Sequence, residues 1–279
     1  YNSSMTDPTK FDFKNSGNSV PQVYEELLVP RMFTPWAKLL LTEAKLSPGE
    51  SLLDVACGPG TVARMASEMS GPKGKVTATD ISPPMLNIAR SKPRSPNAAP
   101  IEYVESPAHP LKVADASFDV TVCQQGLQFF PEKVEALKEM ARATRPGGRI
   151  VVAVWGSLQQ CTIFGEIHAS LEETLPSSIA DMMKAPFSMS DPQQLLALGE
   201  EAGLQDIGIK ACSLPLVFER GIDQAIRILD ATPLAPQISA LPTEDQDAMV
   251  ENLQNRLKRF LNGDQCHGSA VSNIMIGKP

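Results

Sequence analysis

The stretch Leu52–Ala63, LLDVACGPGTVA, decides the fold of this chain. A short apolar run ends in Asp54, glycines follow at Gly58 and Gly60, and a helix-forming segment begins behind them. This order predicts a strand, a tight turn and the start of a helix. Glycine lacks a Cβ, so it can adopt a positive φ and let a ligand lie against the backbone. The N–H groups at the following helix N-terminus are free to bind such a ligand.

A second apolar run, Val76–Thr79, ends in Asp80, 20 residues beyond Gly60. A carboxylate there can accept two hydrogen bonds side by side, as from the two hydroxyls of a ribose. The glycine loop followed by Asp80 also fits a dinucleotide-binding site. Asp54 argues against one, because its carboxylate would repel a pyrophosphate. S-adenosylmethionine carries a sulfonium and an ammonium group instead, and an acid beside the loop would attract both.

Four motifs in order carry a resemblance to a known family. They are Asp54–Thr61 (DVACGPGT), Val76–Asp80 (VTATD), Asp115–Cys123 (DASFDVTVC) and Arg145–Val152 (RPGGRIVV). Together they resemble the successive motifs of class I S-adenosylmethionine-dependent methyltransferases, most closely the ubiquinone/menaquinone-biosynthesis-like (type 11) group. The resemblance extends over residues 20–154 and is weaker beyond them. It implies an enzyme that uses S-adenosyl-L-methionine, releases S-adenosylhomocysteine and methylates a small-molecule acceptor.

Alternating strand and helix patterns predict an α/β fold. The expected strands cover residues 51–56, 75–79, 101–104, 118–123 and 149–155, and the expected helices cover 60–70, 83–91 and 131–144. Such alternation predicts a Rossmann-like, mostly parallel sheet with helices on both faces, and the family implies seven strands. Ligands of such sheets bind at the carboxyl ends of the strands. All the motif residues named above fall on that edge.

The chain divides into a polar N-terminus, expected to be flexible over residues 1–19, and one methyltransferase domain over 20–279. Its cofactor-binding core is expected at 47–156. Beyond the core, the sequence predicts helices at 161–175, 191–202, 223–229 and 243–261 and β-like segments at 207–218 and 269–276. The resemblance implies that two insertions form a helical lid over the active site, namely residues 157–190 and 221–262.

Composition argues against several other functions. Acidic residues outnumber basic ones by 32 to 25, a net charge of −7, which disfavours nucleic-acid binding. No apolar stretch is long enough for a membrane span, and no secretory signal is recognisable. The five cysteines lie far apart without metal-ligand spacing, so we expect reduced thiols, no metal and a cytoplasmic protein. The oligomeric state stays open.

The cofactor is expected along the carboxyl edge, with its methionine end over the glycine loop. Pro107 departs from the family, in which an acid often follows the third strand and binds the adenine amino group. Adenine would then be held by backbone groups or by the Ser106 hydroxyl. The expected cofactor-binding residues are Tyr24, Phe33, Asp54, Ala56, Cys57, Gly58, Gly60, Asp80, Ile81, Met85, Ser106, Pro107, Ala108, Gln124 and Gln125.

The segment after the fourth strand is expected to face the substrate through Gln128, Phe129 and Phe130. It lacks the Asn/Asp-Pro-Pro-aromatic motif, which argues against DNA adenine and protein glutamine as substrates. If the methyl acceptor is an oxygen or nitrogen, His109 or His168 would serve as the catalytic base. Some apolar residues of the lid are expected to line an acceptor pocket above Gln125; the alternative is that they only hold the lid on the sheet. The candidates are Phe33, Met182, Met183, Phe187, Leu229 and Met249.

Two other functions stay open at this point. One is an NAD-dependent oxidoreductase, which Asp54 and the hairpin Arg145–Gly148 argue against. The other is a cofactor-binding protein of the same fold without methyl transfer. An intact glycine loop predicts that the cofactor binds, but it does not predict turnover.

Overall fold

A central sheet organises the molecule. The computed structural model describes residues 20–279, and the N-terminus expected to be flexible, residues 1–19, lies outside them. The main strands are β1 (Ser51–Val55), β2 (Lys75–Asp80), β3 (Ile101–Glu105), β4 (Phe118–Gln124), β5 (Thr144–Trp155), β6 (Gln205–Phe218) and β8 (Gln265–Lys278). Their order is β3-β2-β1-β4-β5-β8-β6, and the two-residue strand β7 (Leu261–Asn262) pairs with β8. The expected seven strands therefore form, together with one short addition.

Strands β1 to β5 are parallel, and β8 is antiparallel to both β5 and β6. Apolar side chains of helices cover both faces. One face packs against α2 (Thr34–Glu43), α3 (Thr61–Ser70) and α4 (Pro83–Ser91), and the other against α5 (Lys133–Ala143) and α8 (Pro192–Glu201). The Rossmann-like expectation is confirmed, and the carboxyl ends of β1, β2 and β4 meet on one edge.

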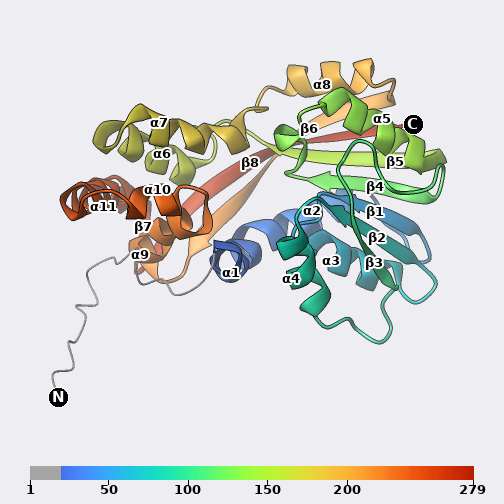
Figure 1. Cartoon of the computed structure of the whole chain (residues 1–279), viewed down its shortest axis with the longest axis horizontal. Helices are drawn as coiled ribbons and strands as arrows, with labels where there is room; N and C mark the ends of the chain where they lie inside the picture. Colours follow the sequence, from blue (N-terminus) through green and yellow to red (C-terminus); the bar gives the residue numbers. More distant parts are fainter. Residues whose placement is uncertain (1–19) are drawn as a thin grey trace.

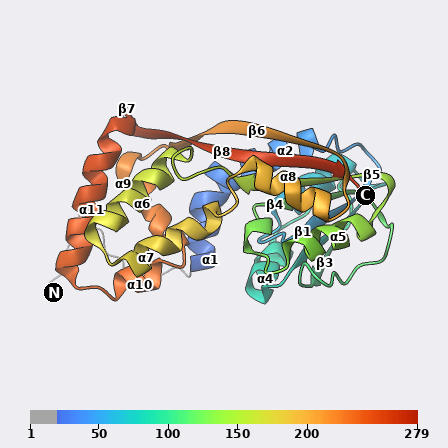
Figure 2. The same ribbon diagram turned by 90° about the horizontal axis from the view of Figure 1, so that it is seen from above.

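A second body of helices lies beyond this edge (Figure 1). We call it the helical lobe; it comprises α1 (Val20–Val23), the π-helix η1 (Tyr24–Phe33), α6 (Thr162–Thr174), α7 (Ser177–Ala180), η3 (Asp181–Phe187), α9 (Gly221–Ile226), η4 (Arg227–Ala231), α10 (Ala235–Ser239), α11 (Thr243–Leu257) and η5 (Lys258–Phe260). Strands β6 and β8 run from the sheet into the lobe as one long ribbon (Figure 2). Their pairing continues as far as Phe218 and Cys266.

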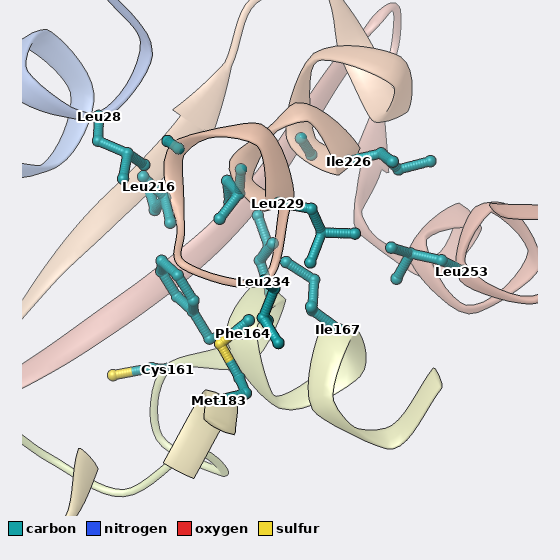
Figure 3. Close-up of a cluster of buried hydrophobic side chains, with 14 of the residues drawn as sticks. Leu28, Cys161, Phe164, Ile167, Met183, Leu216, Ile226, Leu229, Leu234 and Leu253 are labelled. Carbon is teal, nitrogen blue, oxygen red and sulfur yellow. The ribbon is translucent and has the colours of Figure 1, made fainter. Parts of the chain in front are cut away.

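The helical lobe has a hydrophobic core of its own (Figure 3). Ile167 on α6, Leu229 on η4 and Leu253 on α11 are all fully buried there. The two segments expected to form a lid both contribute helices to it, and η1 adds Leu28 and Met32. Among the described residues, no helix is long and apolar enough to cross a membrane. All five cysteines are free.

Truncation of a leucine in the lobe core tests whether this core stabilises the protein. Leu253 is 0% exposed, so Leu253→Ala should lower the free energy of unfolding by about 2–5 kcal/mol. Leu261 is 45% exposed, and Leu261→Ala should change it by less than about 0.5 kcal/mol. Denaturant unfolding of both variants measures the difference. Equal effects would contradict the burial of α11 against the lobe.

Candidate functional site

A cavity of about 570 Å³ lies between the carboxyl edge of the sheet and the helical lobe. This volume is in the range of small-molecule sites, roughly 300–1,000 Å³. Most of the expected cofactor residues line it, namely Tyr24, Phe33, Asp54, Ala56, Cys57, Gly58, Asp80, Ile81, Met85, Ser106, Pro107, Ala108, Gln124 and Gln125. The structure thus brings one side of η1 and the loops after β1 to β4 around a single cavity.

The two glycines of the loop differ in their surroundings. Both have positive φ, +53° at Gly58 and +77° at Gly60. A Cβ on Gly58 would meet nothing within 4 Å, so this position faces open space in the cavity wall. A Cβ on Gly60 would lie 2.9 Å from the Tyr103 hydroxyl and 3.1 Å from the Ala89 Cβ. Gly60 does not line the cavity. Glycine is required at position 60 because Tyr103 and Ala89 pack closely behind the loop.

Asp80 joins the loops that form this wall. Its Oδ2 accepts a 2.7 Å hydrogen bond from Gly58 N–H, and its Oδ1 accepts a 2.8 Å bond from Ser82 N–H. The carboxylate is 9% exposed. Each carboxylate oxygen can accept more than one hydrogen bond, so Asp80 keeps capacity for a ligand. It therefore combines a structural task with the predicted binding of hydroxyl groups.

Asp54 gives the wall its electrostatic character. The side chain is 1% exposed, and its Oδ2 has no hydrogen-bond partner among the described residues. Burial raises the pKa of this carboxyl from 3.8 to about 8; a backbone hydrogen bond from Ala63 opposes the rise, and the charge of Asp80 adds to it. A cationic ligand group would favour the charged form. A cationic ligand group near the end of β1 would therefore interact favourably with the Asp54 carboxylate.

The loop after β3 uses its serine internally. The Ser106 hydroxyl donates to the Pro107 carbonyl at 2.8 Å and accepts from Lys112 N–H at 3.0 Å. Its one hydrogen is therefore engaged in holding the loop. The hydroxyl has no hydrogen left to donate to a ligand but keeps one lone pair that can accept. The apolar Ile81, Met85 and Ala108 line the same wall.

Two glutamines at the end of β4 are fixed through their amide nitrogens. Gln124 Nε2 donates to the Phe33 carbonyl at 3.1 Å, and Gln125 Nε2 donates to the Ser272 hydroxyl at 3.0 Å. The carbonyl oxygen of each carboxamide is buried without a partner among the described residues. Both residues line the cavity. The wall therefore carries two buried hydrogen-bond acceptors that the protein itself does not satisfy.

The two candidate bases lie in different places. His109 lines the cavity, and its Nδ1 is 3.1 Å from Glu132 Oε2. His168 lines a separate depression with Glu172, Asp181 and Lys184. Nδ1 of His168 is 3.5 Å from Glu172. Within residues 20–279, His109 is thus the one histidine on the main cavity wall.

The residues expected to face the substrate also separate. Phe129 and Phe130 line the cavity, and Phe129 is 58% exposed at its mouth. Gln128 is 6% exposed but does not line it. Of the apolar lid candidates, Phe33, Met183 and Phe187 line the cavity, Leu229 and Met249 are buried in the lobe core, and Met182 is 38% exposed.

Sequence reasoning missed part of the apolar wall. Trp155 at the end of β5 and Phe164 on α6 both line the cavity, as does Met32 on η1. The position of Trp155 could have been predicted from the sequence, because it ends a parallel strand on the same edge as Asp54 and Gln124. The position of Phe164 depends on the packing of the lobe, for which the sequence offers no local signal.

Known proteins resemble this chain in both sequence and fold. A family described as "Methyltransferase domain" matches residues 53–152. The demethylmenaquinone methyltransferase of Staphylococcus epidermidis is 30% identical over 187 residues, which cover 63% of this chain and 76% of that enzyme. The chain belongs to the class I S-adenosylmethionine-dependent methyltransferases of the UbiE-like group.

Two further matches concern part of a sequence relative and the fold of a solved structure. The demethylmenaquinone methyltransferase of Lactococcus lactis is 33% identical over 154 residues, covering 54% of this chain, and the chain spans only 61% of that enzyme's length. Phosphoethanolamine N-methyltransferase 2 of Haemonchus contortus, solved with S-adenosyl-L-methionine, has a TM-score of 0.59 at 15% identity. That match covers 98% of this chain and 61% of the nematode enzyme, and it shows a shared fold.

The wall described above fits the cofactor of this methyltransferase family. S-adenosyl-L-methionine has a cationic amino-acid end, a ribose and an adenine ring. The cavity offers the unpartnered carboxyl of Asp54, the open loop position at Gly58, the free acceptor capacity of Asp80 and an apolar surface at Ile81 and Met85. Burial strongly raises the pKa of the Cys57 thiol, so this loop cysteine stays protonated and is unsuited to nucleophilic attack.

Alanine at each loop glycine separates binding from stability. Alanine at either position carries the cost of a positive φ, about 1–2 kcal/mol. Gly58→Ala adds a methyl group in open cavity space, so we expect a folded protein that binds S-adenosylhomocysteine about tenfold more weakly. Gly60→Ala adds a clash with Tyr103 and should lower the free energy of unfolding further than Gly58→Ala does. Calorimetric binding and thermal unfolding of both variants test this. The reverse pattern would contradict the orientation of the loop.

Replacement of the buried acid tests its raised pKa. Between about pH 4 and pH 8 the folded protein retains a proton on Asp54 that the unfolded chain releases, so Asp54 lowers stability progressively as pH rises through this window. Asp54→Asn keeps the shape of the protonated acid and cannot ionise. The unliganded variant should match the wild type at pH 4 and exceed it in free energy of unfolding at pH 8. A pH-independent difference between the two proteins would refute the raised pKa.

Proposed function

We propose that this chain transfers the methyl group of S-adenosylmethionine to a small, largely apolar acceptor bound between the sheet edge and the helical lobe. One observation carries the proposal: a single cavity joins the polar wall at Asp54, Gly58 and Asp80 to an apolar wall at Phe164 and Phe187. A donor and an acceptor molecule can therefore lie side by side. The net charge of −7 supports a small molecule rather than a nucleic acid as the acceptor.

The polar wall would hold the cofactor. Asp54 would accept hydrogen bonds from its ammonium group, the backbone around Gly58 would support its amino-acid end, and Asp80 would accept from its ribose hydroxyls. When bound, the cofactor supplies an already electrophilic methyl group. The chain's own task is to position the acceptor and exclude water. A buried carboxyl beside the loop suits this cofactor better than the pyrophosphate of NAD.

The apolar wall would hold the acceptor. Phe164 and Phe187 lie with their ring centroids 5.5 Å apart, and Trp155 packs edge-on to Phe33; all four line the cavity. These rings offer an apolar surface on which a planar acceptor can stack. Met183, next to them on η3, adds a side chain that adapts to the ligand's shape.

Proton removal, where an acceptor needs it, would fall to His109. Its Nδ1 lies beside Glu132 Oε2, an arrangement that fixes the ring and leaves Nε2 for a ligand. His168 is a weaker candidate, because it lies outside the cavity wall. The five free cysteines support a reducing, cytoplasmic environment.

The apolar wall is tested with neighbouring methionines. Isotope-labelled S-adenosylmethionine is offered with 2-naphthol, 2-naphthylamine and 2-naphthalenethiol, and labelled products are measured by mass spectrometry. Met183 is 3% exposed and lines the cavity, so Met183→Ala should raise the acceptor KM roughly tenfold, consistent with the loss of a buried side chain's contacts. Met182 is 38% exposed outside the wall, and Met182→Ala should leave KM unchanged.

Binding of S-adenosylhomocysteine serves as the control and should be the same in both methionine variants. If the wild type binds S-adenosylhomocysteine but labels none of the three acceptors, the proposed acceptor class is wrong. If it binds NAD and not S-adenosylhomocysteine, the proposed function itself is wrong.

A further inference from the structure

Gln125 holds a hydrogen-bond acceptor that has no use within the protein. The side chain is 6% exposed and lines the cavity, and its Oε1 is buried without a partner among the described residues. Leaving such a group unsatisfied lowers the stability of the folded protein. Native proteins leave few of them, and each calls for an explanation. A ligand in the cavity is the partner that the fold leaves for this oxygen.

The orientation of this carboxamide follows from its neighbours. Ser272 Oγ donates its one hydrogen to the Val154 carbonyl at 2.8 Å, so it can only accept from Gln125. The atom 3.0 Å from Ser272 is therefore the amide nitrogen, and the free atom is the carbonyl oxygen. If the amide were flipped, Gln125 Oε1 would face Ser272 Oγ, and neither atom would have a hydrogen to donate. The carboxamide therefore has one orientation, with its carbonyl oxygen on the cavity wall as a fixed hydrogen-bond acceptor.

The same hydrogen bonds place Gln125 on the side of the cavity proposed to hold the methyl acceptor. Asp54 lies one residue before the end of β1 and Asp80 ends β2, whereas Ser272 lies on β8, two strands beyond β4 in the sheet order. Gln125 N–H also donates to the Ala153 carbonyl of β5 at 2.8 Å. The carboxamide therefore leans away from the cofactor strands and toward Trp155, which pairs with Ser272.

The backbone supports a specific role for this side chain. Gln125 has φ +55°, a conformation that is unfavourable for residues with a Cβ, and Gly126 follows directly. A glycine at position 125 would relieve this strain. The glutamine side chain occupies a strained position on the wall of the cavity, which is typical of residues that contact ligands.

We infer that Gln125 selects a methyl acceptor bearing a hydroxyl or amino group, whose hydrogen it accepts at Oε1. This rests on the proposed function and narrows its substrate class to apolar molecules with one such donor. A carboxamide does not take up the proton, so Gln125 orients the donor group and leaves deprotonation to another group. Ser272 is a positioning residue, because it acts only by holding the amide nitrogen.

A matched pair of probes tests the inference. 2-Naphthol and 2-methylnaphthalene have nearly the same shape, but only the former donates a hydrogen bond, and their fused rings suit the aromatic wall. Equilibrium dialysis against the protein saturated with S-adenosylhomocysteine should show about tenfold tighter binding of 2-naphthol, since a buried acceptor site discriminates against a ligand that lacks the donor. Gln125→Leu should reduce this preference to near one.

Gln128→Leu is the matched control. Gln128 is also 6% exposed and has an unpartnered Oε1, but it does not line the cavity, so its variant should keep the tenfold preference. Ser272→Ala provides a second variant should Gln125→Leu unfold. It releases the amide nitrogen, keeps Gln125 and should lower the preference severalfold without changing S-adenosylhomocysteine affinity.

Three results would overturn the inference. One is equal wild-type affinity for the two probes, and another is failure of both to bind. The third is a Gln125→Leu variant that loses S-adenosylhomocysteine affinity but keeps the tenfold preference, which would assign Gln125 to the cofactor. Absence of S-adenosylhomocysteine binding in the wild type would instead refute the proposed function.

Discussion

The two hydrogen bonds received by the carboxylate of Asp80 hold together the edge on which the cavity depends. Gly58 N–H and Ser82 N–H donate to its two oxygens, while its own backbone carbonyl accepts from Ser106 N–H at 3.0 Å. One residue at the end of β2 thereby fixes the loops that follow β1, β2 and β3. Hydrogen bonds to an ionised acceptor are among the stronger ones in proteins. The polar wall is therefore held together by hydrogen bonds within the chain itself.

Much of the sheet could be predicted from the sequence, because alternating apolar segments determine each strand locally. The expected strands 75–79 and 118–123 differ from β2 and β4 by one residue at the end. Strand β5 begins at Thr144 instead of residue 149, because Thr144 pairs with Phe118 across a register irregularity that leaves no local pattern. Similarly, glycine spacing locates the turn. Only the position of Tyr103 shows that Gly60 serves packing while Gly58 faces the cavity.

The helical lobe explains why the apolar wall was harder to predict. Most of its helices are short, and they depend on packing against segments far away in the sequence. Ion pairs from α6 illustrate this, since Glu166 contacts Arg256 on α11 and Arg259 on η5, about 90 residues away. Met182 and Met183 are the same residue type and adjacent in the sequence, yet Met182 is exposed and Met183 lines the cavity. That difference is set by the face that η3 turns inward.

Buried polar atoms without partners connect the fold to the proposed chemistry. Asp54 Oδ2, Thr61 Oγ1, Gln124 Oε1 and Gln125 Oε1 all belong to residues of one cavity wall. Each costs about 1–3 kcal/mol when unsatisfied. Because a ligand that satisfies these atoms recovers part of that free energy, the wall favours ligands that carry donors at the right places, and selectivity follows from the same atoms that weaken the unliganded protein.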